Sequence, residues 1–484
     1  MYRVLVKTKI VAANAVLLGA CAILAAATAA AMERDDLAAN EETVRGPVVD
    51  PAVEKVNDLG PVAVCFDAED PPSQEEIEAI HRALGVAEDE GGAAYNLSGR
   101  WQGVPGTPIE LTWSFVPDGL WIEAAYNGDD SGPSELFARM DELFDGDREL
   151  WIGRFEETFA RWAELIGTSY TRITVDGTDW DDGDTWGHSG SSARGDIRIA
   201  MRNLNPSGVL AVNFFPPNGD MLLDRDNNWA LGATQLKLRN VIAHEHGHGI
   251  GIKHVCPVTQ TKLMEPFVSQ AFDGPQHDDL RAGQRHYGDN FEIDNGFGFA
   301  TDLGIVTPGA PINIGGVPAP QISYGSILSI DAFGENDYFR FTVLGPVEAT
   351  VLTIPVGLEY DSSTQNTSGS CNSGNFIDSK SIANLNAELI DTDGFAVLAT
   401  ADAEPAGETE VLVSVPLPVA GDYFIKVYEA QSIGPNQSQL YAINITVTSS
   451  LELFEADPPD QAIDARQPSE PDGSNVDGWD SIQL

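Results

Sequence analysis

Two hydrophobic patterns mark the first half of this 484-residue chain as a mixture of helices and strands. Apolar and polar residues alternate over residues 109–116, which predicts a strand with one buried face. Apolar residues recur at helical spacing over residues 149–166, which predicts a long amphipathic helix. A shorter helix is expected over residues 73–84, because Ser73 can cap it and Glu76 completes a capping box.

Beyond residue 288 the pattern changes to short alternating segments that are separated by turn residues. The expected strands are residues 327–330, 337–343, 349–354, 387–390, 411–415, 421–428 and 440–447. A succession of short strands is typical of a β-sandwich. The fold class is therefore predicted to be α+β, with an all-β domain after a mixed one.

The two ends of the chain differ in composition from its interior. Basic residues precede an apolar run over residues 10–31, and small residues near its end suit cleavage of a signal peptide. We therefore expect residues 1–31 to be removed, the protein to be secreted, and no stable membrane insertion afterwards. Cys21, in a lipoprotein-like box, and the length of the run leave a lipid anchor or an uncleaved membrane anchor as alternatives. Residues 450–484 predict a disordered acidic tail.

Composition and charge restrict the partners. Hydrophobic residues make up 42% of the chain, which indicates globular domains rather than disorder. The chain has 74 acidic and 27 basic side chains and a formal net charge of −47, so nucleic acid and anionic membranes are excluded as favoured partners. An acidic surface of this kind suits a saline habitat, or helps to bind divalent cations.

The run His-Glu-His-Gly-His-Gly-Ile-Gly-Ile-Lys-His, which begins at His244, carries the strongest chemical signal. On a helix, His244 and His248 share a face and can bind one cation together. Gly251 permits a turn that brings His254 back as a third imidazole. Three neutral imidazoles with an open fourth position predict one catalytic zinc ion, and Glu245 is placed to activate the zinc-bound water as a general base.

This spacing, HExxHxxGxxH, resembles that of the metzincin metallopeptidases, and Gly247 before the second histidine resembles the matrixin branch. Met264, in Leu-Met-Glu-Pro, stands where the family has a methionine turn under the metal. The resemblance covers about residues 95–288 and implies a twisted mixed sheet with three helices. It also implies that Pro266 and Phe267 help to wall the substrate pocket.

The departures from the matrixin pattern concern further metal ions. Val212 and Leu222 stand in place of the histidines of a structural zinc, so we expect that zinc to be missing, and His188 is a stray loop histidine. Asp224 and Asp226 resemble the carboxylates that hold calcium in the family, and hard oxygen ligands suit that ion. An exposed acidic turn is the alternative interpretation.

Removal of the leader leaves three cysteines, which cannot all pair within one chain. We expect a disulfide between Cys65 and Cys256, which would tie the N-terminal segment to the site. The rival interpretation is a Cys65 thiolate on the zinc, as the propeptide of animal matrixins provides, although the family's Pro-Arg-Cys-Gly motif is absent. A third alternative leaves both thiols free, and Cys371 has no assigned role.

The C-terminal strands also resemble a known domain. Residues 336–341 and 420–427 are similar to motifs of the bacterial pre-peptidase C-terminal domain, which is jelly-roll-like; any secreted β-sandwich is the alternative. The expected order is residues 1–31 signal peptide, 32–94 acidic N-terminal extension or pro-segment, 95–288 peptidase domain, 289–301 linker, 302–449 β-sandwich and 450–484 tail.

These expectations combine into a secreted zinc endopeptidase of matrixin type. It would hydrolyse peptide bonds in extracellular proteins, including those of an extracellular matrix, so its partners would be protein or peptide substrates. The alternative is a cell-surface or matrix-binding protein whose peptidase domain is latent or vestigial. Glu245 accompanies all three candidate ligands, and this favours the active enzyme.

Overall fold

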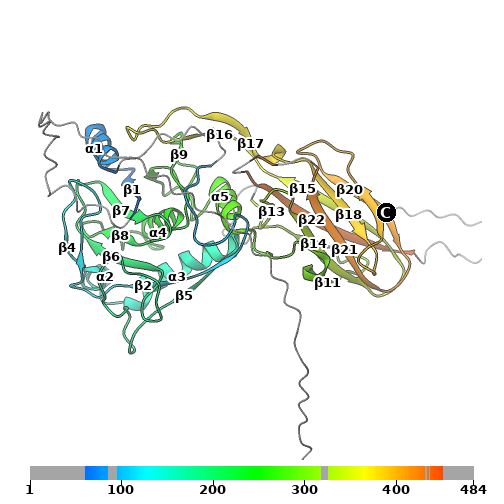
Figure 1. Cartoon of the computed structure of the whole chain (residues 1–484), viewed down its shortest axis with the longest axis horizontal. Coiled ribbons are helices and arrows are strands. Elements are labelled where there is room, and N and C mark those ends of the chain that lie inside the picture. The colour runs from blue at the N-terminus through cyan, green and yellow to red at the C-terminus, as the bar shows by residue number, and fades with distance from the viewer. Residues whose placement is uncertain (1–59, 85–94, 318–324, 431–432, 435–436, 451–484) are drawn as a thin grey trace, which may run out of the picture. The chain divides into compact units, whose positions relative to one another are not determined.

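The computed structural model describes residues 60–84, 95–317, 325–430, 433–434 and 437–450. The signal peptide and the acidic tail that the sequence predicts lie outside these residues. No described helix is both long enough and apolar enough to cross a membrane. In chain order, a mixed sheet with helices is followed by a β-sandwich (Figure 1).

A seven-stranded sheet with the order β10-β1-β7-β8-β6-β2-β5 forms the first part. Its strands are β1 (Val62–Asp67), β2 (Ile109–Phe115), β5 (Thr168–Arg172), β6 (Ile197–Arg202), β7 (Val209–Phe214), β8 (Met221–Asp224) and β10 (Phe267–Val268), and a separate small pair is β3 (Trp121–Ile122) with β4 (Gly132–Pro133). β2 runs parallel to β5 and β6, whereas β7 runs antiparallel to β8. The mixed sheet is confirmed, and β2 is the strand predicted over residues 109–116.

The helices are α1 (Gln74–Leu84), α2 (Leu136–Leu143), α3 (Arg148–Leu165), α4 (Leu236–Gly249) and α5 (His277–Tyr287). α3 is the long helix that the apolar spacing predicts, and it begins where the Asp147 side chain accepts a hydrogen bond from the Leu150 N–H. Its Phe159 ring stacks on Trp113 of β2, with ring centroids 4.9 Å apart. Trp162 of α3 donates to the Ala243 carbonyl of α4 at 3.2 Å, so α3 supports α4 as well as the sheet.

β1 and α1 come from the segment that the sequence assigns to an N-terminal extension. The predicted capping box of α1 is confirmed, since Ser73 and Glu76 each accept a hydrogen bond from the other's backbone N–H. β1 is a full member of the sheet, because Cys65 pairs antiparallel with Ala211 of β7 and Phe66 pairs parallel with Phe267 of β10. β1 therefore covers the edge that β7 would otherwise present to solvent.

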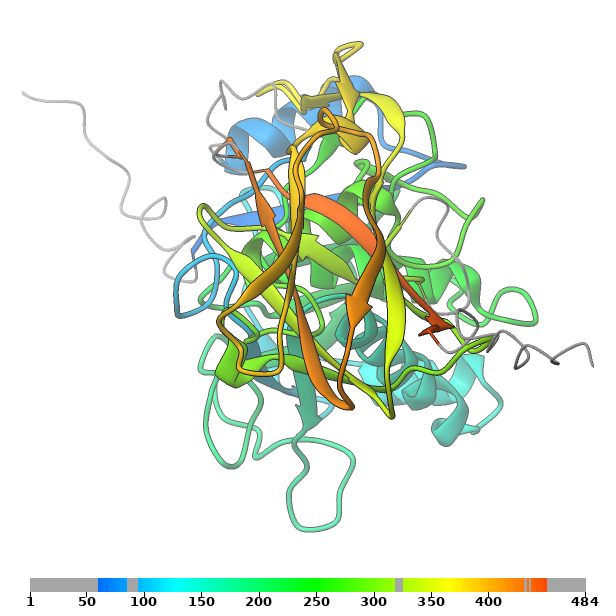
Figure 2. The same ribbon diagram turned by 90° about the vertical axis from the view of Figure 1, so that its right-hand side faces the viewer.

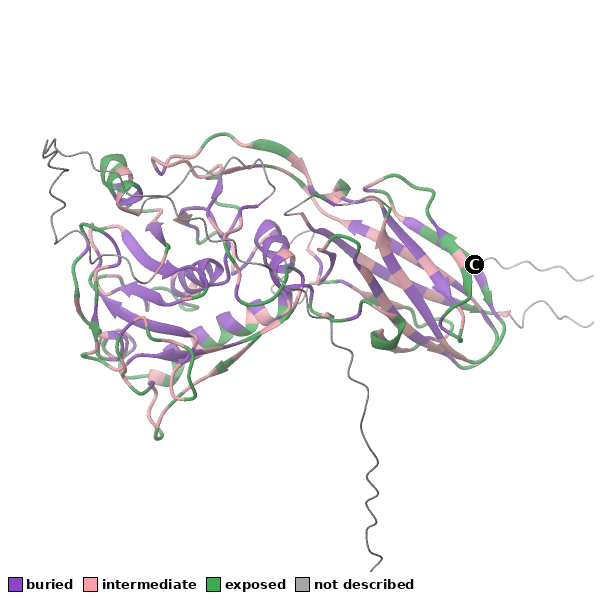
Figure 3. Cartoon of the chain, viewed as in Figure 1, coloured by how far each residue is buried: buried purple, intermediate pink, exposed green. Residues whose placement is uncertain are grey.

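The second part contains two sheets, with the orders β11-β14-β21-β18-β19 and β12-β22-β15-β20; β13 also pairs with β22. The strands are β11 (Thr301–Ile305), β12 (Ile312–Ile314), β13 (Leu328–Ile330), β14 (Asn336–Val343), β15 (Val347–Val356), β18 (Leu385–Ile390), β19 (Val397–Ala401), β20 (Glu410–Leu417), β21 (Gly421–Glu429) and β22 (Gln439–Ser449). Buried and partly buried residues alternate along β14 and β15, which appear banded in Figure 3. The long strands lie side by side in Figure 2, and the expected β-sandwich is confirmed.

A hairpin formed by β16 (Glu359–Thr364) and β17 (Asn375–Asp378) extends from the second part (Figure 1). β16 pairs antiparallel with β9 (Val255–Cys256), which directly follows the last expected zinc ligand. We call residues 359–378 the β16–β17 hairpin. It joins the C-terminal strands to the catalytic region.

Candidate active site

α4 and the turn after it bring the three histidines of the motif together. His244 and His248 lie one turn apart on α4, and both are fully buried. Gly251 adopts φ 93°, and a Cβ at this position would collide with the Gly99 carbonyl, so the turn requires glycine. His254 then returns, and the Nε2 atoms of the three rings lie 3.0 to 3.2 Å from one another.

Hydrogen bonds orient these rings. Each Nδ1 lies 2.7 Å from an oxygen: His244 from the Leu263 carbonyl, His248 from the Ile252 carbonyl, and His254 from Oε1 of Gln365. These oxygens only accept, so each Nδ1 carries the proton and each Nε2 presents a lone pair. Burial lowers the pKa of His244 to about 4 and the pKa values of His248 and His254 well below their usual range. Three neutral nitrogen donors facing one point fit a zinc ion.

Glu245 lies beside this cluster. Its side chain is fully buried, and no N–H or O–H group among the described residues donates to either carboxylate oxygen; the neighbouring Cys65 thiol is its side-chain partner. Burial raises the pKa of this carboxyl to about 8. A buried carboxylate with no partner stronger than a thiol suits a residue whose partner is a water or a substrate.

The methionine turn lies under the cluster, as the family resemblance implies. A Cβ at Gly247 would collide with the Met264 thioether, so the glycine before the second histidine makes room for Met264. Asp279 of α5 holds the turn, because its carboxylate accepts hydrogen bonds from the N–H groups of Leu263 and Met264 at 2.9 and 3.1 Å. Asp279 is a supporting residue that the sequence does not single out, since only the fold brings α5 to this turn.

The structure contradicts the expected disulfide between Cys65 and Cys256. Cys256 is joined to Cys371, with Cα atoms 5.3 Å apart, and Cys65 is a buried free thiol. The reason is the pairing of Ser363 in β16 with Cys256, which brings the β16–β17 hairpin and its Cys371 to β9. Cys65 instead lies in β1 over the catalytic centre, where its Sγ, a ring nitrogen of His244 and a Glu245 oxygen are all within 4.8 Å of one another.

β1 also contacts the residues expected to form the substrate pocket. The Phe66 N–H donates to the Pro266 carbonyl at 3.0 Å, and the rings of Phe66 and Phe267 lie 5.7 Å apart. A cavity of about 410 Å³ borders this strand, and it is lined by β1, α1, residues 96–99, Phe215, His254 and Gln365, among others. β1 therefore lies along the edge of β7 and covers the catalytic centre on that side.

The other candidate metal positions lie away from this centre. Val212 and Leu222 are buried partners on β7 and β8, and the absence of a structural zinc there stays a prediction. The Asp224 carboxylate accepts from the backbone N–H groups of Leu204 and Asp226, so its oxygens already have donors, and calcium stays a prediction. His188 lies on an exposed loop, 3.6 Å from Asp184.

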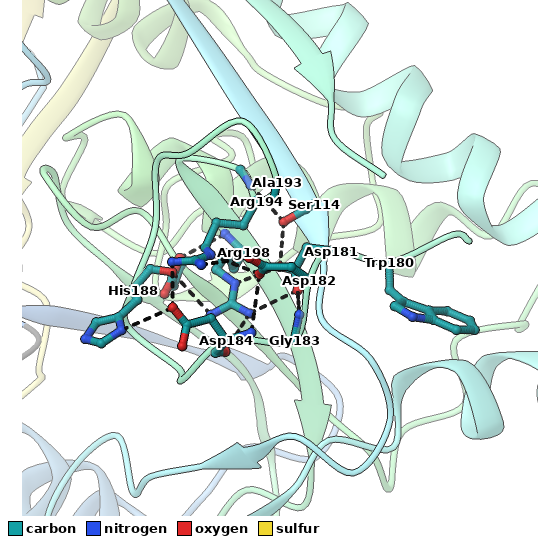
Figure 4. A network of polar contacts seen from close by, with 12 residues as sticks. Ser114, Trp180, Asp181, Asp182, Gly183, Asp184, His188, Ala193, Arg194 and Arg198 are labelled. Atoms are coloured by element: carbon teal, nitrogen blue, oxygen red, sulfur yellow. Dashed lines mark hydrogen bonds and ion pairs between the residues drawn. The ribbon is translucent and has the colours of Figure 1, made fainter. Parts of the chain in front are cut away.

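The loop that contains His188 packs around the side chain of Arg198, which belongs to β6 (Figure 4). Its guanidinium makes a bidentate ion pair with Asp181, at 2.7 and 3.0 Å, and both side chains are fully buried. It also donates to the backbone carbonyls of three loop residues, Asp184, Thr185 and His188. A guanidinium thus holds residues 181–198 together.

Comparison with known proteins agrees with this geometry. Residues 148–288 match the family model for the matrixin peptidases. Stromelysin-3 of Rattus norvegicus is 36% identical over 84 residues, which cover 17% of each chain. Karilysin of Tannerella forsythia is 33% identical over 93 residues, covering 18% of this chain and 19% of karilysin. Matrix metalloproteinase-18 of Xenopus laevis is 31% identical over 140 residues, covering 28% of each chain.

Residues 148–288 form a matrixin domain. The matches to these relatives span between 17% and 28% of the relatives' lengths, so they concern this domain and not the whole chain. The pre-peptidase C-terminal domain of a collagenase from Bacillus anthracis is similar to part of the chain, with 12% identity and a TM-score of 0.17 over 31% of this chain and 94% of that one. A matrixin domain with three converging histidines supports a zinc metallopeptidase.

Proposed function

We propose that this protein is a secreted zinc endopeptidase that cleaves peptide bonds in extracellular proteins. The observation that carries the proposal is the convergence of the Nε2 atoms of His244, His248 and His254 next to the buried carboxylate of Glu245. When bound, zinc supplies a Lewis acid that polarises the peptide carbonyl and acidifies a water molecule. The predicted leader and the disulfide between Cys256 and Cys371 support export, because disulfides persist in oxidising compartments.

The residues of this chain perform the proton transfers. Glu245 takes a proton from the attacking water and passes it to the leaving amine, as a general base and then a general acid. Pro266 lies just before β10 and Phe267 is its first residue. These two residues would form the wall of the pocket that a substrate side chain enters.

Latency is part of the proposal, because β1 occupies the place that a substrate strand would take. Extended peptides bind proteins by adding a strand to an exposed sheet edge. The edge of β7 faces β1, and Cys65 of β1 lies over Glu245 and His244. We infer that β1 must leave this edge before a substrate can bind, so the chain is held inactive in the conformation described here.

Zinc analysis and one conservative substitution test the catalytic proposal. The purified protein is expected to hold one zinc ion per chain at the histidine cluster. After activation by limited proteolysis, Glu245→Gln should retain zinc and lose casein hydrolysis by about two or more orders of magnitude, as expected for a lost general base. Glu110→Gln, on an exposed position of β2, is the matched control. Near-normal hydrolysis by Glu245→Gln would disprove the proposed mechanism.

Substitutions in β1 test the latency. Phe66→Asp places a charge in the buried contact with Phe267 and should release β1, so the full chain should gain activity without proteolysis. Glu69→Gln, at an exposed position just beyond β1, should leave the basal activity unchanged. A wild-type chain that is as active with its N-terminal segment intact as after processing would contradict this part of the proposal.

A further inference from the structure

One hydrogen bond to the histidine cluster comes from outside the matrixin domain. His244 and His248 obtain their Nδ1 acceptors from backbone carbonyls near the cluster, at Leu263 and Ile252. His254 obtains its acceptor from the side chain of Gln365, which lies 111 residues further along the chain in the β16–β17 hairpin. The C-terminal part of the chain thus contributes directly to the catalytic centre.

The orientation of the Gln365 amide follows from its second contact. Its Nε2 donates to the Gly369 carbonyl at 2.7 Å, and a carbonyl only accepts, so the nitrogen must face Gly369. The amide oxygen therefore faces His254, where it accepts from Nδ1–H at 2.7 Å. This hydrogen bond keeps the proton on Nδ1 and directs the Nε2 lone pair of His254 toward the other two histidines.

The hairpin that carries Gln365 is itself held in place. Gln365 forms a bridge with Cys371, and the disulfide from Cys371 to Cys256 joins the hairpin to the strand that follows His254. Asn96 adds a second connection, because its Nδ2 donates to the backbone carbonyls of His254 and Ser363 at 2.7 and 3.3 Å. His254 and Gln365 are therefore fixed relative to each other by two connections, one through the disulfide and one through Asn96.

The β-sandwich behind the hairpin also packs firmly on the matrixin domain. Arg281 of α5 is fully buried and donates to the Ser438 carbonyl and the Tyr360 hydroxyl. His277 contacts the Ser379 hydroxyl at 2.8 Å. These contacts at α5 place the hairpin with little freedom, which suits a residue that must orient a ligand.

We propose that Gln365 is a positioning residue for His254, so that the β-sandwich domain completes the metal centre of the peptidase. This inference rests on the proposed function, because it requires a zinc ion at the histidine cluster. Loss of an outer partner of a metal-bound histidine typically lowers metal affinity by about 10- to 100-fold. The same range is expected here when the acceptor is removed.

Zinc affinity of the full chain, measured by competition with a chromophoric chelator, tests the proposal. Gln365→Leu and Gln365→Ala remove the acceptor and should weaken zinc binding by about 10- to 100-fold. Gln365→Glu keeps an oxygen acceptor for Nδ1–H but loses the donor to the Gly369 carbonyl, so its zinc affinity should fall less than that of Gln365→Leu. The matched control is Asn372→Ala, at an exposed position of the same hairpin.

Further readouts separate positioning from a loss of structure. The absorption bands of the cobalt-substituted protein should change in Gln365→Leu and not in Asn372→Ala, because ligand geometry differs only in the former. Mass spectrometry should show the disulfide between Cys256 and Cys371 in every variant, and Gln365→Ala keeps the test valid should the leucine variant not fold.

The outcomes are distinct for the two proposals. Wild-type protein that binds no zinc would contradict the proposed function. Wild-type protein that binds zinc, with both Gln365→Leu and Gln365→Ala within twofold of its affinity, would overturn the role of Gln365 alone.

Discussion

Replacing Arg198 with methionine tests whether the guanidinium holds the loop between β5 and β6. Methionine keeps an unbranched apolar side chain and removes the charge and the five donors of arginine. The Asp181 carboxylate would then lose the bidentate pair that Arg198 provides inside the protein (Figure 4). Both side chains are fully buried, so water does not replace the lost partner.

The magnitude follows from the contacts that remain. Breaking a buried ion pair by removing one partner typically costs about 3–5 kcal/mol. The Ser114 hydroxyl and the Gly183 N–H each still donate to Asp181 at 2.9 Å, which reduces the penalty. The loop carbonyls that Arg198 binds are near the surface and can turn to water. We therefore expect a loss of about 3 kcal/mol in the free energy of unfolding.

Tryptophan fluorescence in guanidinium chloride measures this loss in the right domain, since all tryptophans except Trp479 lie between Trp101 and Trp229. With a slope of about 4 kcal/mol per M, the midpoint should fall by about 0.8 M. The control is Glu142→Gln, which breaks the ion pair with Arg139 on α2, where the Glu142 side chain is 67% exposed, and should cost less than about 1 kcal/mol. An Arg198→Met loss no larger than the control's would refute the reasoning.

A double substitution sharpens the same test. Asp181→Asn removes the charge that Arg198→Met leaves unpaired in the interior. The double variant should therefore be less destabilised than the sum of the two single losses, by about 1–3 kcal/mol. Additive losses would show that the two side chains stabilise the loop independently of each other.

The remaining predictions concern the cysteines and Asp294, which lies between the two domains. Non-reducing peptide mapping should yield a linked fragment of Cys256 and Cys371, and Cys65 should resist alkylation in the folded chain and react after denaturation; a fragment linking Cys65 to Cys256 would contradict the structure. Burial raises the pKa of Asp294 from 3.8 to about 8, so its contribution to stability is complete below pH 4 and is lost as the pH rises through about 8. Asp294→Asn should flatten the decline in denaturant midpoint between pH 5 and pH 9 in buffer without divalent cations, and an unchanged slope would exclude Asp294 as its source.

Local patterns in the sequence predicted the elements that carry the site. The spacing of His244, His248 and His254 is a property of one helix and one turn, so eleven residues suffice to predict that the side chains converge. The helix α3 and the strand β2 were predicted equally well, because each has a regular period of apolar residues over its whole length. The alternating strands beyond residue 288 likewise predicted the sandwich.

The misses all involve partners that are far apart in the sequence. Cys256 lies two residues after His254, and a disulfide with Cys65 was expected because it would tie the N-terminal segment to the site. Only the pairing of β16 with β9 shows that Cys371 is the partner, and sequence periodicity does not encode which strands of different domains pair. Cys371, in a loop rich in Ser, Asn and Gly, was the signal for a disulfide in this loop, but the sequence did not indicate its partner.

The position of Arg198 is one that strand periodicity alone does not predict. In an alternating strand, an arginine between two isoleucines is expected to face solvent, because charged side chains are rarely buried. Every residue of β6 is nevertheless buried, since the loop between β5 and β6 folds over its outer face and supplies Asp181. Arg198 can be buried because Asp181 neutralises its charge. Asp181 lies in the loop between β5 and β6, where the sequence has no regular apolar pattern.

The source of each acceptor in the histidine cluster determines when the metal centre is complete. The carbonyls that orient His244 and His248 are in place once the matrixin domain has folded. The acceptor of His254 arrives only after the sandwich has packed on α5 and the hairpin has reached β9. The disulfide that retains the hairpin forms in an oxidising compartment. It follows from the proposals for Gln365 and for export that a chain with this disulfide reduced holds zinc less tightly than the disulfide-bonded chain, so tight metal binding and export would be coupled through a single hairpin.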